Sequence, residues 1–272
     1  MVKINSIISL LAVSSLSLVA AMPATSFNSR YESDYCKELD AYLNSKNASL
    51  NICSIEDTDD SSSLLLIKAN TITQDIVDKI NTFEGNLGAI FFENISTIQK
   101  NLNLGSLKTN ALYFDNKHYN GEKKEIYIPR NVLKTAKTLT TLSIYGLNLS
   151  QKNINEISSL TKLTELYFES CTADLDMDYS KLKNLKNLKT LVLSTMFQKG
   201  QGTDRMDEVP ESICQLKKLT YLCLYRNDIS YLPKCMKNLK NLEKLDLALT
   251  DLTSDDIPRA LKRLPNLKIS FE

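Results

Sequence analysis

Apolar residues recur at a fixed spacing along most of this 272-residue chain. In the segment that starts at Leu219, Leu222 and Leu224 are separated by one residue, and Asn227 follows them. Two residues separated by one lie on the same face of an extended strand, so the pair predicts a short strand with one buried side. A buried asparagine can bond backbone groups where the chain turns away from that strand. Such a unit cannot bury its apolar face alone, so it needs neighbouring copies.

Copies of this unit follow one another from about Ser61 to the C-terminus. The residue equivalent to Leu222 is apolar in each copy, and so is the residue two positions later. The markers, spaced 22 to 31 residues apart, are Leu65, Ile90, Leu112, Leu142, Leu166, Leu191, Leu222, Leu245 and Leu267. The asparagine position is less regular, because only Asn70 and Asn227 fit it and Cys171 stands there in the Leu166 repeat. The repeats therefore predict one elongated domain rather than a globule.

The pattern L-x-x-L-x-L-x-x-N-x-L resembles the leucine-rich-repeat family. The resemblance implies an α/β solenoid, or horseshoe, of about nine repeats of 22–31 residues. It implies a concave parallel β-sheet and a convex side of short helices and irregular turns. Thr73, Ser150 and Ser254 predict helix starts on the convex side. Apolar–proline pairs predict irregular turns before short helices at Ile128-Pro129, Val209-Pro210 and Leu232-Pro233.

Two repeats are longer than the others, through insertions at 116–124 and 197–205. Each insertion follows the C-terminal end of a predicted strand. Because parallel strands end at the same edge of a sheet, we expect both insertions to protrude from one rim.

The N-terminal region predicts export and a cap for the solenoid. Residues 1–21 carry Lys3, an apolar run and small residues at Ala20 and Ala21, as a secretory signal peptide does. Residues 22–58 are expected to form a linker and capping region, with a helix at 34–43 capped by Ser33 or Asp34. Residues 59–272 form the expected repeat domain. No second apolar run long enough for a membrane span follows the signal.

Cysteines and glycosylation sequons fit an extracellular or cell-wall location. The even number of six cysteines suits an oxidising compartment. We expect Cys36 and Cys53 to pair within the cap, against the alternative that both pack there unpaired. Sequons begin at Asn47, Asn94 and Asn148, and the last two are expected outside the core. For the remaining cysteines, we expect Cys171 to be buried and Cys223 to be exposed on the concave face, and we leave a Cys214–Cys235 bridge open.

Charge and motif content argue against nucleic-acid binding and catalysis. Thirty-three basic residues oppose 32 acidic ones, so the chain is not built for electrostatic capture of nucleic acid. The single histidine, His118, lies in a lysine-rich segment without a nucleophile at a fixed spacing. Glu165 and Glu169 could in principle act on a glycoside, but exposed strand residues explain them more simply. We therefore expect no enzyme, no cofactor and no metal site.

The outward positions of the predicted strands form the candidate binding site. In the second to fifth repeats they are aromatic or acidic, without lysine or arginine; the candidate residues are Phe91, Glu93, Tyr113, Asp115, Tyr145, Glu165, Tyr167, Glu169 and, farther along, Tyr225. Tyrosine favours interfaces, although β-propensity alone also places such residues on strands. We predict a secreted binding protein that recognises a protein or a glycan through its concave face. The alternatives are a structural cell-wall or matrix glycoprotein and an inhibitor of extracellular hydrolases.

Overall fold

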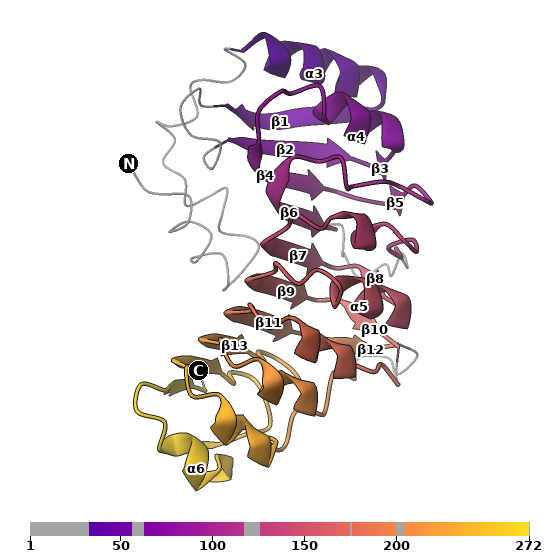
Figure 1. Cartoon of the computed structure of the whole chain (residues 1–272). Coiled ribbons are helices and arrows are strands. Elements are labelled where there is room, and N and C mark those ends of the chain that lie inside the picture. Colours follow the sequence, from indigo (N-terminus) through magenta and orange to yellow (C-terminus); the bar gives the residue numbers. More distant parts are fainter. Residues whose placement is uncertain (1–32, 56–62, 117–125, 175, 200–203, 272) are drawn as a thin grey trace.

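The structure, a computed structural model, describes residues 33–55, 63–116, 126–174, 176–199 and 204–271. One ten-stranded sheet runs along the whole molecule as a ladder (Figure 1). Its strands, in spatial and in chain order, are β1 (Ala48–Ser54), β2 (Leu64–Ala69), β4 (Leu87–Glu93), β6 (Thr109–Asp115), β7 (Thr141–Tyr145), β9 (Glu165–Glu169), β11 (Thr190–Ser194), β13 (Tyr221–Cys223), β14 (Lys244–Asp246) and β15 (Lys268–Ser270). The strands from β2 onward are parallel, so each repeat crosses over the convex side before it adds the next strand.

The strand register confirms the repeat alignment in all units but the last. Leu65 pairs with Ile90, and the markers stay aligned as far as Leu222 with Leu245. In β15, however, Ile269 rather than Leu267 pairs with Leu245. The last marker was therefore placed two residues too early, because both residues are apolar and the spacing alone does not distinguish them.

Two small ladders form the rim just after the main strands. One joins β8 (Asn148–Leu149), β10 (Thr172–Ala173) and β12 (Phe197–Gln198). The other joins β3 (Thr71–Ile72) and β5 (Thr97–Ile98). The insertion at 197–205 thus begins as a rim strand rather than as a loop. The insertion at 116–124 falls on residues outside the described ranges after Asn116, which is buried.

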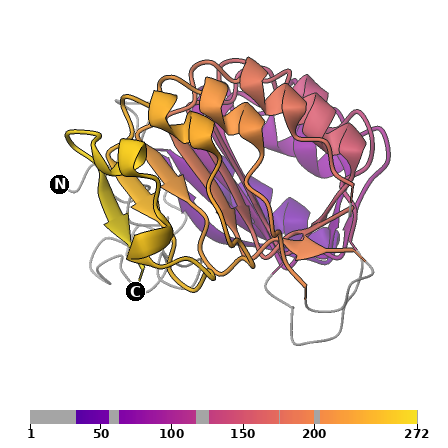
Figure 2. The same ribbon diagram turned by 90° about the horizontal axis from the view of Figure 1, so that it is seen from below.

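The convex side carries short α-helices and 3-10 helices (Figure 2). The predicted helices after Thr73 and Ser150 are confirmed as α4 (Gln74–Ile80) and α5 (Gln151–Ile157), the second with a capping box. The apolar–proline pairs precede 3-10 helices, as predicted. The 3-10 helices are η3 (Leu133–Thr135), η4 (Ser180–Asn184), η5 (Glu211–Gln215), η6 (Lys234–Asn238) and η7 (Ser254–Asp256).

The helix predicted from Ser254 onward is wrong as a single element. It is split into η7, which Thr253 caps, and the four-residue α6 (Arg259–Lys262). Pro258 has no backbone N–H and forces the residue before it out of the helical region. Ile257 accordingly has an extended ψ of 124°.

The core combines apolar strand residues with a few buried polar groups. Asn227 is fully enclosed: its Oδ1 accepts from the N–H of Met196 at 2.9 Å, and its Nδ2 donates to the carbonyls of Leu193 and Leu224. Cys171 takes the equivalent place, as predicted, and its Sγ lies 3.2 Å from the Ile144 carbonyl.

The prediction for Asn70 is wrong, because this residue is exposed. The strand β2 continues to Ala69, one position farther than β4 runs relative to its marker, and Ala69 is buried. Asn70 therefore lies one residue past the inward-facing position. Its exposed side chain accepts a hydrogen bond from the hydroxyl of Ser96.

The N-terminal end of the described sheet is built from α3 (Asp34–Ser45) and β1. Ser33 caps α3 by accepting from the N–H of Cys36, which confirms the predicted helix. A disulfide between Cys36 and Cys53 ties α3 to β1. The antiparallel pairing of β1 with β2 was not predicted. The expected signal peptide at 1–21 and the start of the linker lie outside the described residues.

A left-handed residue recurs just beyond the strands. The fourth residue after the marker has a φ between 52° and 68° in six repeats: Asn94, Gly146, Ser170, Thr195, Arg226 and Leu249. Only glycine adopts this conformation without steric cost. At Gly146 a Cβ atom would come within 2.9 Å of the Asn116 carbonyl oxygen, so space as well as φ demands glycine there.

Candidate functional site on the concave face

In-register pairing arranges the outward side chains in two rows across the concave face. The first row runs through Phe91, Tyr113, Ser143, Tyr167, Val192 and Cys223. The second row runs through Glu93, Asp115, Tyr145, Glu169 and Ser194. We call Phe91, Tyr113, Asp115, Tyr145, Glu165, Tyr167 and Glu169 the aromatic–acidic patch. The structure brings these seven predicted residues together on four neighbouring strands, β4 to β9.

The rings of the patch are more buried than expected for a concave surface. Tyr113 is only 8% exposed and Tyr167 only 5%. The rings of Phe91 and Tyr113 are stacked, with centroids 4.0 Å apart and planes within 6°. Small neighbours such as Ala111 and Ser143 leave room for the rings to lie along the sheet. The patch is therefore a packed surface rather than a row of freely projecting side chains.

Hydroxyl groups gather around Glu165 at one side of the patch. Its Oε2 accepts from the Tyr167 hydroxyl at 3.1 Å and from Thr141 Oγ1 at 3.3 Å. The buried Tyr113 hydroxyl has no hydrogen-bond partner among the described residues. Burial, and secondarily the charge of Glu165, raises the pKa of both tyrosines far above the usual value. Both hydroxyls consequently stay neutral and able to donate.

Glu169 differs from an ordinary surface carboxyl group. Burial first, and then the nearby charge of Asp115, raises its pKa to about 7. Near neutral pH this group can therefore either accept or donate a hydrogen bond. Both Glu165 and Glu169 are half-buried, so the description of them as exposed strand residues is wrong.

A hollow of about 490 Å³ adjoins the patch over the later strands. Glu165 and Tyr167 form one end of it, and Lys244, Asp246 and Lys268 lie toward the other. The sequence did not indicate this hollow. Many of its lining residues point outward from the position just before the marker of each repeat, which the two rows do not include. In addition, the wrong register predicted for β15 had assigned Lys268 to the first row instead of to this position.

No family model matches the chain. Its structure is similar to that of an internalin (inlF) from Listeria monocytogenes, with a TM-score of 0.52 and 21% identity over 74% of this chain and 52% of that one. An internalin C2 from the same organism gives a TM-score of 0.50 and 18% identity, covering 76% of this chain and 80% of that one. The protein is a leucine-rich-repeat solenoid.

Among curated proteins, the solenoid is 28% identical over 127 residues to a volume-regulated anion channel subunit, LRRC8D, of Rattus norvegicus. The match covers 47% of this chain and 14% of that protein. The solenoid therefore spans only a small part of the length of this relative.

Two of the predicted residues are not counted in the patch. Glu93 pairs with Asp115 at the β4 edge of the second row, and its carboxyl group is buried. Tyr225 is 36% exposed but follows β13, and its carbonyl accepts from the N–H of Thr195. Ser194 lies between it and Glu169 across the sheet. We therefore leave both residues out of the aromatic–acidic patch.

The three sequons occupy different environments. Asn47 is exposed and Asn94 is half-buried, both with left-handed backbones. Asn148 lies in the rim strand β8 and is only 8% exposed. The expectation that Asn148 sits outside the core is wrong. Asn148 belongs to the rim strand β8, and pairing with β10 covers its side chain.

The cysteines form two disulfides, Cys36–Cys53 and Cys214–Cys235, with S–S distances of 2.04 Å and 2.08 Å. Cys171 and Cys223 are unpaired and buried. The exposed position predicted for Cys223 is wrong, since Tyr167, Tyr221 and Val192 enclose it. Burial raises the pKa of its thiol to about 12, so it stays an unreactive thiol at neutral pH.

Within the described ranges, no three histidine, cysteine or acidic side chains are grouped to hold a metal ion. His118 lies outside those ranges. Among the described helices, none is long and apolar enough to cross a bilayer.

Proposed function

We propose that this solenoid is an exported, non-enzymatic binding protein that holds a protein ligand on its aromatic–acidic patch. The observation that carries the proposal is the Tyr113 hydroxyl, which is buried without a hydrogen-bond partner among the described residues. A buried hydroxyl that lacks a partner costs about 1–3 kcal/mol. Because the hydroxyl itself is covered, a ligand recovers this energy when the Tyr113 ring turns outward to meet it.

The surrounding groups define what the ligand offers. The stacked rings of Phe91 and Tyr113 provide flat apolar area. Asp115, Glu165 and Glu169 provide carboxyl oxygens, and no lysine or arginine lies within the patch. A segment that presents amide or cationic donors beside an apolar side chain complements this surface.

Export is supported by the signal-like sequence at 1–21 and by the two disulfides. Disulfides of this kind persist in oxidising compartments and are rare in the cytosol. A protein ligand met outside the cell includes the basic cleft of a hydrolase, so inhibition of such an enzyme is one form of this function.

The experiment is a selection of ligands for the chain that begins at Met22, from a displayed peptide library and from a glycan array in parallel. Selected peptides are then titrated against wild type, Tyr113→Phe and Tyr145→Ala. Tyr113→Phe removes only the hydroxyl, and we expect it to weaken binding about fivefold or more. Tyr231→Ala, at a residue that is 49% exposed and outside the patch, is the matched control.

Equal affinity of Tyr113→Phe, Tyr145→Ala and wild type for the selected peptides would remove the patch as the binding surface. Enrichment on the glycan array alone would replace the protein ligand by a carbohydrate. Absence of ligands on both, with the protein retained in the wall or matrix fraction, would favour a structural glycoprotein.

A further inference from the structure

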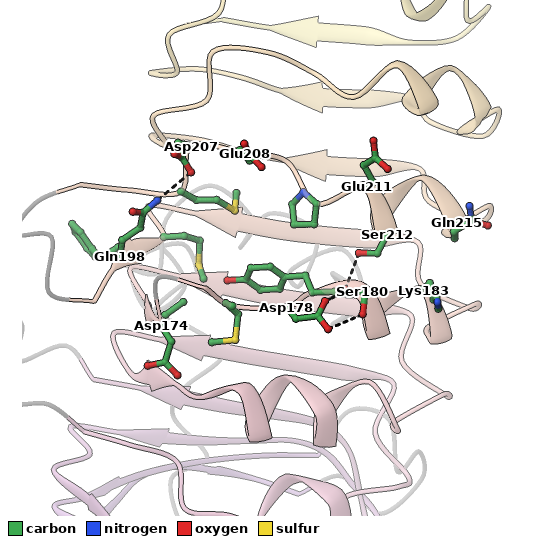
Figure 3. Close-up of a pocket in the computed structure, with 17 residues that line it drawn as sticks. Asp174, Asp178, Ser180, Lys183, Gln198, Asp207, Glu208, Glu211, Ser212 and Gln215 are labelled. Atoms are coloured by element: carbon green, nitrogen blue, oxygen red, sulfur yellow. Dashed lines mark hydrogen bonds between the residues drawn. The ribbon is translucent and has the colours of Figure 1, made fainter.

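A pocket of about 690 Å³ opens on the flank of the solenoid, between two neighbouring repeats (Figure 3). It lies between the rim strands β10 and β12 and the 3-10 helices η4 and η5. Asp174 and Asp178 stand on the wall of one repeat, whereas Asp207, Glu208 and Glu211 stand on the wall of the next. None of its lining residues belongs to the aromatic–acidic patch.

The pocket accompanies an extra rung that the 197–205 insertion adds to the rim. After β12 the chain folds back, and the N–H of Met206 donates to the carbonyl of Met196 at 2.7 Å. The N–H of Asp228 in the next repeat then donates to Met206 rather than to β12. The extra rung lies between the two repeats at the rim, whereas at the helices the hydroxyl of Ser212 joins them directly by donating to the Tyr179 carbonyl at 2.8 Å. The two repeats are therefore bonded directly at the helices and through the extra rung at the rim.

The lining of the pocket combines apolar and polar side chains in about equal measure. Met177, Met196, Met206 and Phe197 contribute thioethers and a ring. Thioether side chains are flexible and polarizable, so they adapt to different apolar stems. Tyr179 also lines the pocket and is mostly buried, yet its hydroxyl makes no hydrogen bond with the residues that the structure describes. A ligand group that donates a hydrogen bond to this hydroxyl, or accepts one from it, would therefore stabilise the bound state.

Five carboxyl groups and a single ammonium group, that of Lys183, surround this lining. Asp178 and Asp207 already accept hydrogen bonds from neighbours within the pocket. Across the described part of the chain, the carboxylates of Asp174 and Glu211 form neither a hydrogen bond nor an ion pair. They stand at opposite ends of the pocket, so they make its surroundings negative and attract a cation without both touching it.

We propose that this pocket binds an arginine or lysine side chain that a peptide segment of a partner protein presents. The aliphatic stem lies on the thioethers, and the cationic head is held by the Tyr179 hydroxyl and by the combined charge of the five carboxyl groups around the pocket. The pocket volume lies within the usual range for ligand sites. This makes the flank a second docking site, independent of the ligand held on the concave face.

The test uses the methionines as reporters. The chain carries six methionines, and three of them line the pocket. Methyl-labelled protein is titrated with acetyl-AlaArgAlaArgAla-amide and with its lysine counterpart, and the resonances of Met177, Met196 and Met206 are followed. We expect these three to shift, while Met236, which is buried in η6, does not. The same peptide with glutamate in place of arginine should leave all four unchanged.

Charge-neutralising variants locate the interaction. Asp174→Asn combined with Glu211→Gln should raise the dissociation constant of the arginine peptide about fivefold or more. Neither side chain has a structural partner, so the fold should be retained. Glu84→Gln, at an exposed position in another repeat, is the matched control and should bind like wild type. Tyr179→Phe should weaken binding by a smaller factor, and added salt should weaken binding of the cationic peptide generally.

The proposal is overturned if the pocket methionines do not shift at peptide concentrations of about 10 mM. It is also overturned if the glutamate peptide produces the same shifts, if Met236 shifts as much as the other three, or if the doubly neutralised variant binds like wild type. Because the reporters lie in the pocket, none of these results depends on whether the aromatic–acidic patch binds its own ligand.

Discussion

The first half of the sheet, β4 to β9, and the second half, β11 to β15, bury similar cores in different ways. In the first half the strands have five to seven residues, and Phe92, Phe114 and Phe168 fill the interior. In the second half β13, β14 and β15 have three residues each, and leucines fill the interior. Behind the second half, the helices η5 and η6 are joined by a disulfide.

This difference shows how one repeat pattern supports two kinds of surface. Longer strands place more outward side chains in register, and the first half uses them for the aromatic–acidic patch. The second half has fewer outward positions, but its repeats are tied by Asn227 and a disulfide, and an inserted rung accompanies a pocket where it meets the last repeat of the first half. The four predictions below test whether the halves are stabilised as differently as they are built.

The largest expected effect is the loss of a phenylalanine from the first half. Phe168 is fully buried, and Phe168→Ala should lower the free energy of unfolding by about 4 kcal/mol. Because repeats contact mainly their neighbours, hydrogen exchange should accelerate most in β7, β9 and β11. Urea unfolding and exchange of the same sample measure both effects. A uniform acceleration throughout the sheet would show that the halves behave as one cooperative unit.

The disulfide of the second half should contribute nearly as much. Replacing Cys214 and Cys235 together by serine should cost about 3 kcal/mol, because the unfolded chain is no longer constrained. Exchange should increase in η5 and η6 and leave α4 unchanged. Reduction of the wild-type protein is the companion measurement. An unchanged urea midpoint would mean that the short helices hold together without the covalent bond.

Asn227 tests the hydrogen bonds that tie the second half together. Asn227→Ala leaves the N–H of Met196 and two carbonyl groups without their partner in a buried site. We expect a loss of about 2 kcal/mol. Asn70→Ala, at the exposed counterpart after β2, should change the free energy of unfolding by less than about 0.5 kcal/mol. Similar losses in both variants would contradict the difference in burial.

The smallest effect concerns the buried charge of the first half. Because the pKa of Glu169 is raised from 4.5 to about 7 on folding, the folded protein holds this proton more tightly than the unfolded chain. Stability should therefore fall as the pH rises from about 4.5 to about 7, and Glu169→Gln should remove that loss. Urea unfolding should show equal stability near pH 4 and an advantage of about 1–2 kcal/mol for the variant near pH 8. A difference that does not change with pH would refute the assignment, and exposed Glu243→Gln is the control.

The sequence predicted most of what depends on spacing. The paired apolar residues located nine of the ten sheet strands, although the last was placed in the wrong register, and the apolar–proline pairs located three 3-10 helices. The helix caps at Ser33 and Ser150 were also found, because capping needs only local sequence. Errors arose where two residues fit equally well, as with Leu267 and Ile269, and where Asn70 lay one position past the turn.

The sequence predicted which residues form the candidate site, but not how their side chains pack. Strand register placed Tyr113 beside Phe91, and strand alternation placed Tyr167 on the same face as Glu165. Neither says how far a ring lies along the sheet. Burial of Cys223 and the raised pKa of Glu169 depend on side-chain packing across three strands. The flank pocket depends on a hydrogen bond between Met206 and Met196, which no periodicity reveals.

The left-handed residues beyond the strands have a consequence for how this protein can change over time. Ser170, Thr195, Arg226 and Leu249 hold a backbone conformation that costs an ordinary residue about 1–2 kcal/mol, whereas glycine or asparagine would adopt it more easily. The chain thus retains strain that single substitutions could relieve. Such relief would offset the destabilisation that new side chains on the concave face usually bring. The solenoid can therefore gain stability by substitution at these positions, and its binding surface can diversify without loss of the fold.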